Sequence, residues 1–167
     1  MIKAHLLAQL DREAPRSRKV LAELPDGNGD WKPHEKSMAL EYLANLVAVM
    51  PTWIALQTNR DDLDLAPKDG SSITHEKKTT SAQYVSALDA AVDQARAALE
   101  ATTDEHLATM WKLKVRGAVV QEDTRDIMIQ DTISHWSHHR GQLTVYLRLL
   151  NRKVPSTFGP SADDKVF

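Results

Sequence analysis

Three of the seven histidines of this chain fall within five residues near its C-terminus: His135, His138 and His139. On an α-helix, His135 and His139 differ by ~40° in direction and are ~6 Å apart along the axis. This is the spacing at which paired helical histidines bind one metal ion. The sequence therefore predicts a divalent metal site, with zinc or nickel as the expected ion and His135 and His139 as the ligands.

Two neighbours are candidates for additional ligands. Asp131 lies one turn before His135, where it could bind the metal or orient a ligating imidazole. His138 is directed ~100° away from His139, which favours a flanking or interface role over a third ligand. Two interpretations without metal stay open: structural histidines, either hydrogen-bonded in the core or on the surface, and a catalytic His–Asp pair. The second lacks a serine or cysteine visibly placed as its nucleophile.

Long helices must position these side chains. Apolar residues recur with helical spacing in four stretches: about 2–24, 37–54, 80–101 and 124–150. Four amphipathic helices predict an all-α four-helix bundle, here a single domain over residues 1–167. The connections after the second and third helices are long, and the prolines at 155 and 160 predict an irregular C-terminal tail.

Single residues refine this prediction. Pro15 should kink or split the first helix, and Pro51 should bend the second. Ser37 is the expected N-cap of the second helix. Arg140 is expected to pair with a carboxylate on a neighbouring helix, and Gly141 to allow a close helix approach or leave room for a ligand. Residues 110–115 alternate weakly, which is compatible with an extended segment.

The composition excludes several classes of function. With 42% hydrophobic and 26% charged residues, it is that of an ordinary globular protein. A net charge of -2 disfavours nucleic-acid binding, which needs Lys and Arg at phosphates. The absence of cysteine excludes disulfides, thiolate ligands and a cysteine nucleophile. No run approaches the ~18 apolar residues of a membrane span, so we expect a cytoplasmic protein without a membrane partner.

Three segments resemble one family. The motif His-x-x-x-His-Arg-Gly-Gln at residues 135–142 is similar to that of the DinB/YfiT-like superfamily of metal-binding four-helix bundles. Residues 31–38 with the following 43–53, and the tail at 154–163, resemble further family segments in the same order. The resemblance covers most of the chain. It implies a DinB-like bundle, a tendency to form homodimers, and a divalent metal used by thiol-dependent S-transferases, isomerases or hydrolases that act on small molecules.

The sequence departs from the family pattern at one position. Family members commonly carry a third metal-binding histidine on the second helix, in a Leu-Ala-x-His context, whereas this chain has Leu46 there. Two functions therefore stay open. One is a metal-dependent thiol S-transferase or hydrolase with His135 and His139 as ligands. The other is a degenerate, non-catalytic bundle that binds a small molecule or a partner, with the metal absent because the third ligand is missing.

Overall fold

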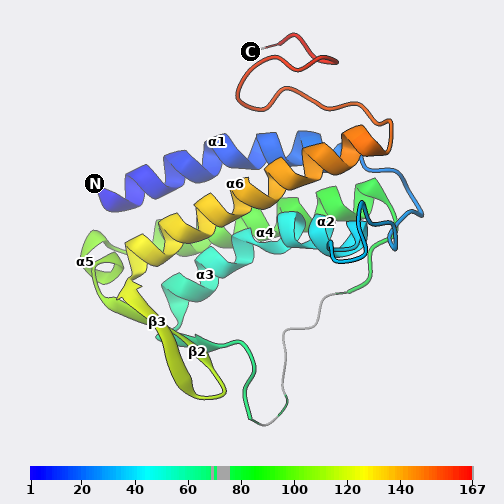
Figure 1. Ribbon diagram of the computed structural model, residues 1–167. Helices are drawn as coiled ribbons and strands as arrows, with labels where there is room; N and C mark the ends of the chain where they lie inside the picture. The colour runs from blue at the N-terminus through cyan, green and yellow to red at the C-terminus, as the bar shows by residue number, and fades with distance from the viewer. Residues whose placement is uncertain (69, 71–75, 167) are drawn as a thin grey trace.

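The computed structural model describes residues 1–68, 70 and 76–166. Its helices are α1 (Ile2–Ala22), α2 (Leu40–Val49), α3 (Pro51–Asn59), α4 (Ser81–Ala101), α5 (Asp104–Leu107) and α6 (Arg125–Leu149). Its strands are β1 (Asp62–Asp64), β2 (Met110–Val115) and β3 (Ala118–Thr124). Figure 1 shows α1, α4, α6 and the α2–α3 run side by side, with the strands projecting from one end.

The prediction of a mostly helical fold is confirmed, whereas that of an all-α four-helix bundle holds only in part, because the described residues form six helices and a small sheet. The three-stranded sheet has the order β1-β2-β3. Strand β1 pairs with β2 in parallel, and β2 pairs with β3 in antiparallel orientation. The weakly alternating segment at 110–115 is indeed extended. Arg116 and Gly117 both have positive φ, as expected at the two central positions of a tight hairpin turn between β2 and β3.

Two helix-boundary predictions are wrong. Pro15 does not split α1, because it lies on the exposed face, where water can bond the carbonyl of the residue four positions earlier. Ser37 does not cap α2. Its N-cap is Ala39, which makes no side-chain capping bond. Pro51, at the start of α3, separates α2 from α3, and proline is well suited to a first helical turn.

The helix ends of α4 and α6 lie close to the predicted ones. Thr80 caps α4 in a capping box with Gln83, which satisfies backbone donors at both positions. Thr124 is the N-cap residue of α6. Between the helices lies one apolar core, whose largest fully buried side chains include Leu10, Leu43, Ile54, Leu88, Leu99, Ile129 and Trp136.

An ion pair is buried beside this core. Arg140 of α6 is 2% exposed and its Nη1 lies 2.5 Å from Glu13 Oε2 of α1, in an ion pair that lacks hydrogen-bond alignment. Arg140 also donates to Ser17 Oγ and Ser137 Oγ. The predicted pairing of Arg140 with a neighbouring helix is therefore confirmed. Gly141 is not needed for a close approach between helices, since a Cβ at this position would meet no atom within 4 Å.

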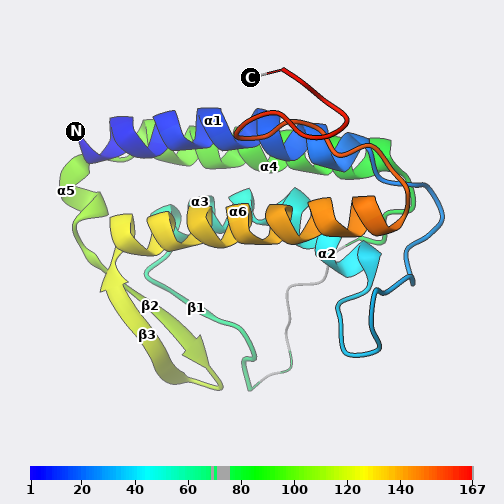
Figure 2. The same cartoon turned by 45° about the horizontal axis from the view of Figure 1, so that its top comes forward.

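The irregular C-terminal tail folds back over α1 (Figure 2). Asp163 accepts hydrogen bonds from Arg148 and from the backbone N–H of Val154, and these bonds lower its pKa. The Phe158 ring lies 4.1 Å from the guanidinium carbon of Arg16. None of the described helices is both long and apolar enough to cross a membrane.

Candidate ligand and metal site

Helix α6 brings His135 and His139 together. Their ring centroids are 4.5 Å apart and the rings are tilted by 44°. His139 is buried, and its Nδ1 lies 2.8 Å from Gln142 Oε1. An amide oxygen only accepts, so the ring must donate from Nδ1, which leaves the Nε2 lone pair free for a metal or a ligand.

His135 is more exposed, and the Trp53 ring of α3 lies 6.0 Å from it. Partial burial lowers the pKa of His135 below its usual value of about 6.5, and the neighbouring rings of His139 and His138 lower it further. The imidazole is therefore neutral at pH 7, which is the form that binds metals or accepts hydrogen bonds.

The other two candidate ligands, Asp131 and His138, do not complete a three-ligand set among the described residues. Asp131 is exposed and accepts a 3.3 Å hydrogen bond from Gln121 Nε2 of β3. His138 is exposed, with its ring centroid 5.2 Å from that of His139. Across residues 1–68, 70 and 76–166, no three His, Asp or Glu side chains are grouped so as to hold a metal ion. The donor set thus falls short of the three protein ligands typical of a catalytic zinc.

A cavity of about 340 Å³ opens beside His135, between α3, the sheet and α6. Most of its wall is apolar, and its polar side chains come from α3, β3 and α6. It is lined by Trp53, Leu56, Gln57, Leu63, Leu65, Trp111, Leu113, Gln121, Met128, Asp131, Thr132 and His135. An apolar cavity with a few convergent polar groups is the usual form of a small-molecule site. Leu46 and Trp53 line a second cavity, which Leu65 also borders.

The sequence model of the DinB family matches residues 1–165. The chain belongs to the DinB family. A DinB-like protein from Bacillus cereus shares 19% identity and a TM-score of 0.70, over 92% of this chain and 95% of that one. The DinB-like protein YjoA from Bacillus subtilis shares 17% identity and a TM-score of 0.68, over 97% and 99%. At these identities, the two likenesses show that both proteins share the fold of this chain. No curated protein matches the sequence.

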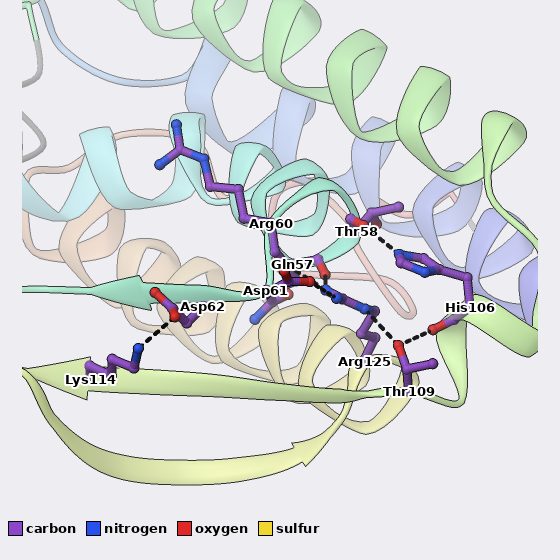
Figure 3. Close-up of polar contacts among 9 residues, drawn as sticks. All are labelled: Gln57, Thr58, Arg60, Asp61, Asp62, His106, Thr109, Lys114 and Arg125. Carbon is purple, nitrogen blue, oxygen red and sulfur yellow. Dashed lines mark hydrogen bonds and ion pairs between the residues drawn. The ribbon is translucent and has the colours of Figure 1, made fainter.

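In this DinB-family chain, a buried arginine joins two walls of the cavity. Arg125 begins α6, is 3% exposed, and donates to the carbonyl oxygens of Gln57 and Arg60 at the end of α3. It also donates to Thr109 Oγ1 and pairs with Asp61 (Figure 3). The last carbonyls of a helix have no partner within the helix, so Arg125 closes α3 and fixes it against α6.

Replacing Arg125 with methionine is expected to lower the free energy of unfolding by about 2 kcal/mol, because the buried Gln57 carbonyl and the half-buried Arg60 carbonyl lose their donor. Denaturant unfolding followed by circular dichroism measures this. Arg148→Met is the matched control: Arg148 is also on α6, but is half exposed and paired with Asp163. Equal, small changes in both variants would show that Arg125 does not hold the two helices.

The pKa of His135 can be measured directly by NMR titration of its ring protons. We expect a value below 6.5, and a rise that stays below 6.5 in His139→Phe, because one of the two imidazoles that disfavour a charge on His135 is removed while the burial remains. A lowered histidine pKa means that the unfolded chain binds the proton more readily. This contribution to stability is therefore present above pH 6.5 and is lost as the pH falls. A His135 pKa at or above 6.5 would contradict the burial argument.

The two histidines were predicted from their spacing, whereas the wall residues Gln57, Trp111 and Thr132 were not. The weak alternation of residues 110–115 was compatible with an extended segment but did not reveal which segments pair with it. His106 lies in α5, and its Nε2 is 2.9 Å from the Thr58 carbonyl (Figure 3). His75 lies outside the described residues.

Proposed function

We propose that this DinB-family chain binds a small, largely apolar molecule in the cavity between α3, the sheet and α6. The observation that carries the proposal is the cavity itself, about 340 Å³ with two tryptophans in its wall and His135 at its edge. Its volume lies within the ~300–1,000 Å³ of small-molecule sites. The neutral His135 ring gives such a ligand a polar anchor.

A cavity-filling variant tests this proposal. Leu113→Trp places a larger side chain on a residue that lines the cavity. Val120→Trp makes a similar change on the adjacent strand β3, where Val120 is 56% exposed. Calorimetric titration with uncharged aromatic fragments should show binding to the wild type and Val120→Trp, and at least tenfold weaker binding to Leu113→Trp. Equal binding by both variants would place the ligand elsewhere.

We further propose that His135 and His139 bind zinc or nickel at two points, with water or a bound ligand completing the coordination. The free Nε2 of His139 and the 4.5 Å ring separation support this. Asp131 and His138 remain the candidates for an additional ligand after local movement. Because the described residues supply no third donor in place, we assign no reaction step to the metal.

The second candidate function is the metal-dependent thiol S-transferase or hydrolase that the family resemblance implies. The convergence of the two imidazoles is the observation that favours it. Elemental analysis of the protein without a histidine tag, beside His135→Ala and His139→Ala, tests the metal site on which this second function depends. Stoichiometric metal that both variants lose would favour the enzyme. A folded, metal-free protein that does not respond to zinc or nickel would favour the small-molecule binder.

We also propose that two copies of the chain pair through α6. Val145 and Leu149 lie one turn apart on this helix and are 57% and 54% exposed, which is unusual for neighbouring apolar side chains. Light scattering of the purified protein should give the mass of a dimer, and Val145→Lys should shift it toward the monomer. A wild-type monomer at micromolar concentration would refute the pairing. A cytoplasmic location remains part of the proposal.

A further inference from the structure

Gln57 carries an unused hydrogen-bond donor at the cavity wall. Its side chain is 6% exposed, and Oε1 accepts a 3.0 Å hydrogen bond from Thr132 Oγ1. Both residues line the cavity. The amide nitrogen Nε2 donates to no acceptor in the described part of the protein. It is not among the fully buried unpaired atoms, so it keeps access to the cavity. A buried amide normally uses its donors as well as its acceptor.

Trp111, in the same wall, carries an unpaired donor that is closed off from the cavity. It is 1% exposed, and its indole Nε1 is buried without a hydrogen-bond partner among the described residues. Trp136, which is equally buried in the bundle core, donates from Nε1 to the Val47 carbonyl at 2.8 Å. Buried indole N–H groups usually find such an acceptor. Trp111 therefore contributes the apolar face of its ring to the cavity, and its N–H is not a donor that an entering ligand can reach.

The Gln57 donor is held in place from two sides. Arg125 Nη1 donates to the Gln57 backbone carbonyl at 2.7 Å (Figure 3), and Thr132 holds the side-chain oxygen. A donor that is fixed before binding loses little conformational freedom when an acceptor arrives. This arrangement favours recognition of one acceptor atom at a defined position.

The charge of the wall restricts which acceptor can enter. Among the described residues, those that line the cavity include no lysine or arginine, and Asp131 adds a negative charge to the lining. A carboxylate or phosphate would enter without a cationic partner, at a large desolvation cost. An uncharged oxygen, such as a ketone or amide carbonyl, avoids this cost.

We infer that the cavity selects an uncharged aromatic compound whose carbonyl oxygen accepts a hydrogen bond from Gln57 Nε2. The indoles of Trp53 and Trp111 supply apolar surface for the flat part of the ligand. This inference rests on the proposed function, since it names the ligand class of the same cavity.

Three probes test it on the wild-type protein. Propiophenone carries a carbonyl, propylbenzene replaces that carbonyl with a methylene group, and benzoate carries a charge. We expect calorimetry to show propiophenone binding about tenfold more tightly than propylbenzene, and benzoate more weakly than both. The Trp111 indole N–H signal, assigned by its loss in Trp111→Phe, should shift when propiophenone binds, because the Trp111 ring lines the cavity.

Variants assign the preference to its donor. Gln57→Met should bring the affinities for propiophenone and propylbenzene within about twofold of each other. Gln121→Met is the matched control: Gln121 lines the same cavity but already donates to Asp131, so the tenfold preference should remain. Amide spectra of each variant establish that it is folded.

The outcomes separate the two proposals. Equal binding of propiophenone and propylbenzene by the wild type would overturn the carbonyl inference and leave the cavity as a small-molecule site. Tighter binding of benzoate would overturn the requirement for an uncharged ligand. A preference that survives Gln57→Met would overturn the role of Gln57. Failure of every probe to bind would overturn the proposed function together with this inference.

Discussion

Replacing Glu13 with glutamine is expected to lower the free energy of unfolding by about 3–5 kcal/mol, because Arg140 is left as a buried charge without its counterion. Arg140 is 2% exposed and the Glu13 side chain 7% exposed, so water cannot replace the lost carboxylate. The remaining partners of Arg140 are neutral hydroxyl and carbonyl oxygens. Urea unfolding at pH 7 measures the change.

Two further variants check the cause. Asp89→Asn removes a carboxylate from an exposed ion pair with Arg18, also on α1, and should have a much smaller effect. The double variant Glu13→Leu with Arg140→Met should recover most of the lost stability, since buried pairs are often replaceable by apolar residues. If Glu13→Gln and Asp89→Asn cost the same, the buried pair does not join α1 to α6 as described.

The second large effect is expected from Leu46→His, which should raise the affinity for zinc or nickel about a hundredfold, or roughly 2.7 kcal/mol. A third imidazole would complete the three-ligand set to which His135 and His139 contribute two. Leu46 is partly buried and lines a cavity with Trp53, whose ring lies 6.0 Å from His135. Calorimetric titration of the tag-free protein gives the affinity.

Asn45→His is the matched control for this variant. Asn45 precedes Leu46 on α2, and its side chain is directed ~100° away. Asn45 accepts a hydrogen bond from Lys78. A histidine at position 45 should leave the metal affinity within about threefold of the wild type. If Leu46→His also leaves it unchanged, Leu46 does not face the histidine pair.

The local features of the fold were the more predictable ones. The apolar spacing from Tyr84 to Leu99 and the capping residue Thr80 define α4 almost to the residue. The division of the second helical stretch at Pro51 was expected only as a bend. The continuity of α1 through Pro15 could not be predicted, because it depends on which face of the helix meets the solvent.

In the candidate site, too, the features set by local geometry were predictable and those set by long-range pairing were not. The spacing of His135 and His139 within one helix predicted their contact, since both positions depend on local geometry alone. The cavity depends on the parallel pairing of Leu63 with Leu113, two residues far apart in the sequence. A three-residue strand such as β1 has too little pattern to reveal its partner, so Gln57 and Trp111 were not recognised as wall residues.

The NMR signals of the four tryptophan indoles report most directly on ligand binding in the cavity. Trp53 and Trp111 line it, whereas Trp31 packs against Tyr146 and Trp136 donates to Val47 in the core. Titration with uncharged aromatic fragments should shift the signals of Trp53 and Trp111 and leave those of Trp31 and Trp136 in place. Binding that moves only Trp31 or Trp136, or no binding by any fragment, would contradict a small-molecule site between α3, α6 and the sheet.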